Sequence, residues 1–233
     1  MTFSPSPPRV TGVILAGGLA TRYGGVAKGL VRVGGARIVD RVAAALAAAA
    51  DDLLLIANGA EADAWLPGVR RAADVLPGQG SLGGLHAALV HAGGAALVVA
   101  WDMPFVPASL LSALRALGAA PGVDAAVPES GSRRGVEPLC AYYSPACLPP
   151  IERRLAAGDR RVHALFEDVR VARLPAAEVA RHGDPSRMFM NVNAPDDLAA
   201  AERLVERPTT PTAARAAESH APSADGGRDR PEA

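Results

Sequence analysis

The chain has 233 residues, 49% of them hydrophobic, which is enough for one α/β domain with a full core. Its 24 basic and 24 acidic residues give a formal net charge of zero, so the basic excess typical of nucleic-acid-binding proteins is absent and we expect no nucleic-acid partner. No apolar run reaches the ~18 residues of a membrane span, and the first eight residues lack a signal-peptide pattern, so we expect a cytoplasmic protein without membrane contact.

Strand-type and helix-type patterns alternate along the chain. Strands are predicted at residues 10–15, 53–57, 69–73, 95–101, 124–127, 139–143 and 169–174. Helices are predicted at residues 37–50, 81–91 with Ser81 as cap, 107–117, 145–157 and 195–205. This alternation predicts a single Rossmann-like three-layer α/β domain with a mostly parallel sheet. Ligands of such sheets bind beyond the carboxyl ends of the strands.

The end of the chain differs in composition from the rest. Residues 206–233 contain no Val, Ile, Leu, Met or aromatic residue. A segment of this kind buries too little apolar surface to offset its ordering entropy. We therefore expect residues 8–205 to form the domain and residues 206–233 to form a disordered tail.

A glycine-rich loop follows the first strand and runs from Leu15 to Lys28 as LAGGLATRYGGVAK. Glycines let backbone amides approach phosphate oxygens closely, and Arg22 and Lys28 add positive charge. The spacing fits neither a P-loop nor a dinucleotide fingerprint. The loop therefore predicts a polyphosphate site of another type, the alternative being a glycine-rich turn with two solvated bases.

An acidic residue, Asp102, directly follows the buried strand at residues 95–101. A carboxylate at the carboxyl end of such a strand faces the ligand crevice. It can hold Mg²⁺, which takes few protein ligands and several phosphate oxygens. The alternative is that Asp102 caps the helix predicted to start near Pro107.

Taken together, these motifs resemble those of the GT-A-like nucleotidyltransferases, and among them those of the molybdenum cofactor guanylyltransferases. The similar segments include LAGG followed by an Arg and a Lys, the DMPF turn at Asp102, GDRRV from Gly158, and FMNVNAPDDL from Phe189. Gly17 favours GTP, because the related cytidylyltransferases usually carry Ala there. Two residues depart from the family pattern: Tyr23 replaces the usual Met, and Ala27 replaces the Asp that usually precedes the Lys.

The resemblance also implies roles for individual residues. The implied catalytic residues are Lys28, Arg22 and Asp102, with Asp102 binding Mg²⁺ as the cofactor. The implied GTP-binding residues are Leu15, Ala16, Gly17, Gly18, Lys28, Asn58, Asp74 and Asp102. The implied contacts with the second substrate are Asn191, Asn193, Arg160 and Arg161. From the sequence alone, Asn58 and Asp74 are equally compatible with turn residues, and Arg160 and Arg161 with a solvated pair.

The activity implied by the resemblance is transfer of GMP from GTP to molybdenum-bound molybdopterin, with release of pyrophosphate. GTP and molybdenum-bound molybdopterin are then the small-molecule partners, and molybdoenzymes or their chaperones are the expected protein partners. Two alternatives stay open. One is a related nucleotidyltransferase that uses CTP or a sugar phosphate, and the other is an inactive nucleotide-binding accessory protein, which the departure at Ala27 motivates.

Overall fold

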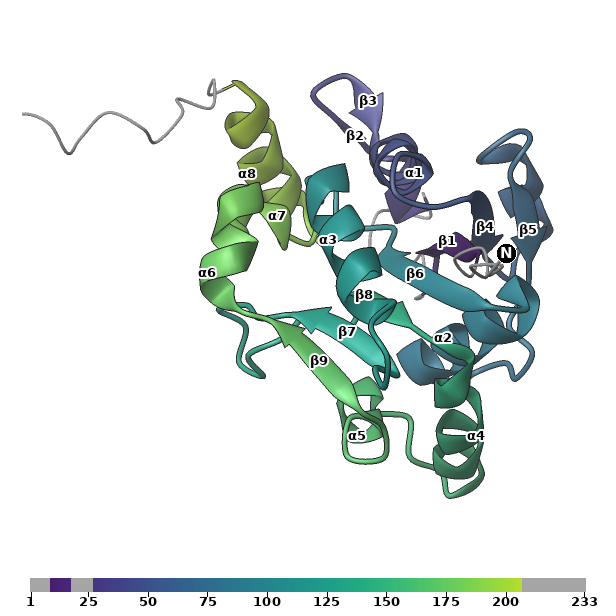
Figure 1. Ribbon diagram of the computed structural model, residues 1–233. Coiled ribbons are helices and arrows are strands. Elements are labelled where there is room, and N and C mark those ends of the chain that lie inside the picture. Colours follow the sequence, from purple (N-terminus) through teal and green to yellow (C-terminus); the bar gives the residue numbers. More distant parts are fainter. Residues whose placement is uncertain (1–8, 18–26, 207–233) are drawn as a thin grey trace, which may run out of the picture.

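A computed structural model describes residues 9–17 and 27–206 of the chain (Figure 1). The central feature is a seven-stranded sheet with the order β5-β4-β1-β6-β8-β7-β9. Its strands are β1 (Val10–Leu15), β4 (Asp52–Ile56), β5 (Arg70–Ala72), β6 (Ala95–Ala100), β7 (Ala125–Pro128), β8 (Cys140–Tyr143) and β9 (Val171–Leu174). Only β8 runs antiparallel to its neighbours in this sheet, so the predicted mostly parallel sheet is confirmed.

The core lies on both faces of this sheet. Successive side chains of a strand point to opposite faces, and β1 follows this rule: Val13 and Leu15 join one apolar cluster, whereas Ile14 joins the other. All six residues of β1 are buried. This explains why the strand, apart from Thr11, has no polar side chain and does not alternate, as is typical of a parallel strand covered on both sides.

Helices cover both faces, as predicted, and together they form three layers with the sheet (Figure 1). The α-helices are α1 (Ile38–Ala47), α2 (Gly80–Ala92), α3 (Ala108–Gly118), α4 (Leu148–Ala156), α5 (Val162–Leu165), α6 (Ala176–Val179), α7 (Pro185–Met188) and α8 (Pro195–Glu206). Helices α1, α3 and α8 pack on the first face, and α2, α4 and α5 pack on the second. Glu206, which we expected to begin the tail, is the last residue of α8, and residues 207–233 lie outside the described part of the chain.

Several local predictions were wrong. Ser81 does not cap α2, because the helix already begins at Gly80 and its N-cap is Gln79. The segment that begins at Pro145 starts as a 3-10 turn, η4 (Pro145–Cys147), before α4. Six short helical elements were not predicted from periodicity: α5, α6, α7 and the 3-10 helices η2 (Lys28–Leu30), η3 (Ala60–Ala64) and η5 (Ala180–His182). They span only three to five residues each, which is too short for a 3.6-residue pattern to repeat.

A small hairpin between Lys28 and α1 was also missed. It consists of β2 (Arg32–Val33) and β3 (Ala36–Arg37), which pair antiparallel. Its turn is Gly34-Gly35, with φ angles of 57° and 78° that favour glycine. The Gly-Gly pair is a recognised hairpin signal and was available in the sequence.

Both cysteines, Cys140 and Cys147, are free and buried, as expected for ordinary core thiols. Burial raises the pKa of the Cys147 thiol to about 12, so it stays protonated at neutral pH. Among the described residues, none of the helices is long and apolar enough to cross a membrane.

Candidate active site

The ends of β1, β4 and β6 lie level at one edge of the sheet. Beyond the strands, the carbonyl of Leu15 accepts the backbone N–H of Trp101 (3.2 Å), and the N–H of Ala16 donates to the carbonyl of Ile56 (2.9 Å). The N–H of Ala57 in turn donates to the carbonyl of Ala72 at the end of β5 (2.9 Å). The residues that follow these strands therefore share the carboxyl edge, as the sequence predicted, and they include Gly17, Asn58, Asp74 and Asp102.

Lys28, the last residue of the glycine-rich loop, opens the 3-10 turn η2 (Lys28–Leu30), just after the described chain resumes at Ala27. Its Nζ donates a hydrogen bond to Oδ1 of Asn193 over 2.5 Å, across 165 positions of sequence. An ammonium group has three donor hydrogens. Asn193 takes one of them, so two remain available to a ligand.

Gly29, the residue after Lys28, packs tightly against the ring of Trp101. A Cβ at Gly29 would lie 3.0 Å from Cδ2 and 3.1 Å from Cζ3 of Trp101, and still closer to Cε3. Trp101 is 3% exposed and stacks on Trp65 with ring centroids 5.1 Å apart. A glycine is therefore needed at position 29 to let the Lys28 turn approach the end of β6.

Asp102 stands in the turn after β6, close enough to Lys28 for their charges to interact. Burial raises the pKa of its carboxyl group above the usual range, and the positive charge of Lys28 opposes that rise. The backbone carbonyl of Asp102 accepts the N–H of Val192 (2.9 Å). The alternative role as a helix cap is wrong, because α3 begins at Ala108 with Pro107 as its N-cap.

The carboxylate of Asp102 suits a hard cation that takes most of its ligands from substrate phosphates and water. No group of three or more His, Cys, Asp or Glu side chains that would hold a metal occurs within the described segments. Asp102 is a partly buried carboxylate beside a predicted phosphate site. Mg²⁺ usually binds through one or two carboxylates plus phosphates and water, so the residues fit this ion.

Asn58 and Asp74 form a closed pair at the ends of β4 and β5. The Nδ2 group of Asn58 donates to Oδ2 of Asp74 (2.8 Å). The backbone N–H of Asp74 donates to Oδ1 of Asn58 (2.8 Å). Each side chain therefore fixes the other at the carboxyl edge, which is a more specific arrangement than two independent turn residues.

The four residues expected at the second substrate do not lie together. Asn193 contacts Lys28, whereas Asn191 is exposed and donates only a long 3.4 Å bond to the carbonyl of Phe189. Arg160 is exposed. Both Nε and Nη2 of Arg161 donate to Asp159 (2.9 Å each), so its guanidinium is already partly paired.

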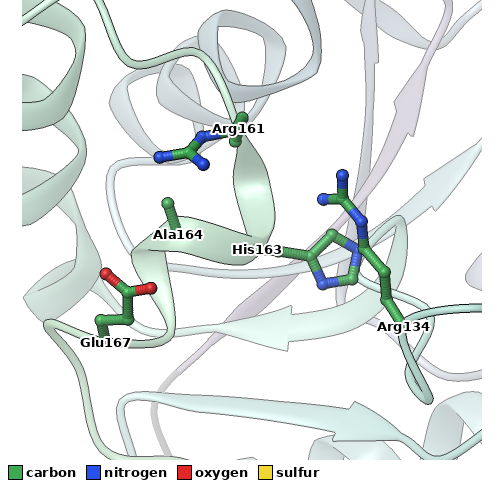
Figure 2. Close-up of a pocket in the computed structure, with 5 residues that line it drawn as sticks. All are labelled: Arg134, Arg161, His163, Ala164 and Glu167. Atoms are coloured by element: carbon green, nitrogen blue, oxygen red, sulfur yellow. The ribbon is translucent and has the colours of Figure 1, made fainter.

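Arg161 also borders a surface hollow of about 390 Å³ (Figure 2). The lining residues are Arg134, Arg161, His163, Ala164 and Glu167. The guanidinium of Arg134 lies beside the His163 ring (Figure 2); burial lowers the pKa of His163, and the charge of Arg134 lowers it further. The hollow adjoins α5, whose buried residues share one apolar cluster with α2 and α4, whereas Leu30 and Val192, the neighbours of Lys28 and Asn193, belong to the cluster of α1, α3 and α8.

Two expected site residues, Gly18 and Arg22, lie outside the described residues. The structure instead adds residues that the sequence analysis did not assign: Trp101, Arg134, His163 and Asp197. The backbone N–H groups of Asn193 and Ala194 both donate to Oδ2 of Asp197 (2.9 and 2.8 Å). An acid three residues into a predicted helix is a known capping signal, so Asp197 was detectable; the tertiary contacts of Trp101 and Arg134 were not.

Comparison with known proteins gives matches over most of the chain. Residues 12–177 match the family model described as MobA-like NTP transferase domain. A Desulfosudis oleivorans protein named molybdenum cofactor guanylyltransferase is 35% identical over 199 residues, covering 84% of this chain and 96% of the relative.

Two solved structures are also similar. One is molybdopterin-guanine dinucleotide biosynthesis protein A from Archaeoglobus fulgidus, with a TM-score of 0.73, 29% identity, and coverage of 84% of this chain and 98% of that one. The other is a Mycobacterium tuberculosis protein crystallised with manganese, with a TM-score of 0.57 and 20% identity, covering 85% of this chain and 100% of that one. The second likeness concerns the fold alone.

Proposed function

The chain belongs to the MobA-like NTP transferase family, and we propose that it transfers GMP from GTP to molybdenum-bound molybdopterin with release of pyrophosphate. The name of the Desulfosudis oleivorans relative, molybdenum cofactor guanylyltransferase, supports this activity. The name of the Archaeoglobus fulgidus protein, molybdopterin-guanine dinucleotide biosynthesis protein A, supports it as well. Both relatives match along nearly their whole length.

The observation that carries the proposal is the grouping of Lys28, Asn193 and Asp102. These residues stand at the carboxyl edge beside the start of the glycine-rich loop at Gly17. The Lys28 ammonium, oriented by the neutral amide of Asn193, is suited to the negative charges of a nucleotide's phosphates. The nearby Asp102 carboxylate is suited to the divalent ion that such a substrate brings.

In the proposed reaction an oxygen of the acceptor's terminal phosphate attacks the α-phosphorus of GTP. A new P–O bond forms there, the bond between the α-phosphorus and the bridging oxygen breaks, and pyrophosphate leaves with that oxygen. Lys28 donates to the phosphates and stabilises the charge that develops on the leaving group. The protein contributes mainly orientation and charge stabilisation, as phosphate-transfer chemistry requires.

Asp102 would hold Mg²⁺ together with phosphate oxygens, and the ion supplies neutralisation of the phosphate charge when bound. We assign Arg22 and the loop residues Leu15, Ala16, Gly17 and Gly18 to the phosphates. We assign Asn58 and Asp74, fixed as a pair, to the nucleoside side.

For the acceptor we assign Asn191, Asn193, Arg160 and Arg161. The hollow beside Arg161 offers donors and acceptors together, since Arg134, His163 and Glu167 line it. A pterin presents donors and acceptors on its ring edge as well, so this surface is chemically suited to the acceptor.

Pyrophosphate release tests the proposal. The full chain is incubated with molybdenum-bound molybdopterin, Mg²⁺ and each of GTP, CTP, ATP and UTP, and we expect release with GTP. Release with CTP alone would place the chain with cytidylyl transfer, and no release with any nucleotide would favour the accessory-protein alternative.

The metal assignment has its own control. Asp102→Asn is expected to lose about 100-fold or more in kcat/KM, which is the order of magnitude for removing one charged transition-state contact. Asp52→Asn is the matched control. It changes an exposed carboxylate at the start of β4, which is the end of the strand away from the carboxyl edge, and is expected to keep full activity. Full activity in Asp102→Asn would refute the metal role.

A further inference from the structure

The segment from Asn191 to Ala194 connects two parts of the proposed site. Its Val192 N–H donates to the carbonyl of Asp102 (2.9 Å), and the side chain of Asn193 accepts the Lys28 ammonium (2.5 Å). One short stretch of backbone thus touches both the metal carboxylate's turn and the phosphate-binding lysine. If this stretch is displaced, the Asn193 side-chain oxygen moves, and Lys28 loses the acceptor that orients its ammonium group.

Asp197 fixes the position of this stretch. It occupies the third helical position of α8, where an acid can reach back to the N-cap amide. Its Oδ2 atom accepts the N–H of Ala194 (2.8 Å), as such a cap does, and also the N–H of Asn193 (2.9 Å). The second bond is made to the residue that holds Lys28, and capping α8 does not require it.

The far end of α8 is tied to the same region of the chain. Oε2 of Glu202 accepts the backbone N–H of Gly34 (3.0 Å) at the tip of the hairpin that follows Lys28. A Cβ at Gly34 would come within 3.2 Å of Cβ of Val205, so this tip lies directly on the helix. Helix α8 therefore contacts the Lys28 region at both ends, through Asn193 and through the hairpin.

We infer that Asp197 is a positioning residue: it holds the Asn193 backbone so that the Asn193 amide orients Lys28 toward the nucleotide phosphates. The inference rests on the proposed function for its catalytic consequence, but its structural part does not. It assigns no contact with substrate to Asp197. The competing explanation is that Asp197 only stabilises the start of α8.

A double-mutant cycle separates these explanations. Asp197→Ala is expected to lower kcat/KM with GTP by about 10- to 100-fold, the order expected when a reacting group is misplaced by an ångström. In an Asn193→Ala background the same change is expected to have less than about a twofold further effect, because the contact it serves is already gone. Equal, additive losses in both backgrounds would overturn the inference.

Asp196→Ala is the matched control. Asp196 is an exposed acid in the same first turn of α8, so its loss removes a comparable favourable charge from the helix start. We expect kcat/KM to be unchanged in this variant. If Asp196→Ala and Asp197→Ala lower kcat/KM equally, the effect belongs to the helix start and not to Asn193.

Hydrogen exchange tests the same inference without turnover. Asp197→Ala is expected to speed amide exchange of Asn193 and Ala194 at least about tenfold relative to wild type, while Asp196→Ala leaves it unchanged. Unchanged exchange in Asp197→Ala would overturn the inference. If Asp197→Ala does not fold, Asp197→Asn keeps an acceptor oxygen and is expected to give a smaller change in exchange and in kcat/KM. If wild type releases no pyrophosphate, the proposed function fails, and exchange alone then decides the role of Asp197.

Discussion

Replacement of Gly29 by alanine probes the packing that sets the Lys28 turn. The added Cβ would stand 3.0 Å from Cδ2 and 3.1 Å from Cζ3 of Trp101, and closer to Cε3. Carbon atoms pack best at about 3.5–4.0 Å, and the contact with Cε3 is the closest, so the ring or the turn must move by roughly one to one and a half ångströms. The indole has little freedom to retreat, because it is 3% exposed and stacks against Trp65.

We therefore expect Gly29→Ala to lower the free energy of unfolding by about 1–3 kcal/mol, the range for overpacking a filled core. If the turn yields rather than the ring, Lys28 is displaced, and kcat/KM for pyrophosphate release from GTP falls by up to about 100-fold. Urea unfolding measures the first effect and steady-state kinetics the second. The chain has two tryptophans, and both are in this stack, so near-ultraviolet circular dichroism reports whether the ring has moved.

Two further variants control the interpretation. In Gly84→Ala the new Cβ would lie 3.8 Å from the nearest methyl of Leu15, so this helical site is expected to gain up to about 1 kcal/mol of stability. Trp101→Phe gives the new methyl room and is expected to restore part of the lost activity when combined with Gly29→Ala. If the single variant Gly29→Ala has the stability and kcat/KM of the wild type, the packing argument is refuted.

Three more predictions follow from individual contacts. Asn58→Ala breaks the pair with Asp74, and we expect KM for GTP to rise about tenfold at similar kcat, as for the loss of one hydrogen bond; an unchanged KM would exclude this pair from nucleotide binding. His86→Leu removes a buried Nδ1 without a hydrogen-bond partner in the described structure and only one long contact, 3.5 Å from Nε2 to the exposed Glu152, so urea unfolding should show equal or greater stability, whereas a clear loss would contradict this. The hydrogen bonds from Arg170 hold the pKa of Asp124 below its usual range, so this carboxylate adds stability above about pH 4 that is lost as pH falls through its folded pKa. Asp124→Asn should therefore flatten the acid limb of Tm against pH, and a parallel limb would be evidence against that contribution.

The parts of the fold that the sequence predicted are those with long, regular patterns. Strand β1 matches its predicted bounds, Val10–Leu15, because an apolar run that ends in glycines leaves little choice. The placement of Asp102 at the carboxyl edge followed from its position after such a run. The short hairpin at Gly34 was missed although its Gly-Gly turn was visible, because two-residue strands carry no periodicity.

The contacts within the site could not be predicted from the sequence. Lys28 and Asn193 are 165 positions apart, and no local pattern relates them. The same holds for Gly29 and Trp101, whose close approach depends on how η2 lies across the end of β6. Family resemblance indicated that Arg160 and Arg161 belong to the acceptor side, but only the structure shows that Asp159 holds Arg161 and leaves Arg160 exposed.

Transfer of label from GTP tests the central claim most directly. The full chain is incubated with molybdenum-bound molybdopterin, Mg²⁺ and GTP labelled with ³²P at either the α- or the γ-phosphate, and the pterin product is isolated. Nucleotidyl transfer predicts that the pterin product carries the α-label and that the γ-label appears in pyrophosphate. Recovery of the γ-label in the pterin, or of neither label, would contradict the account.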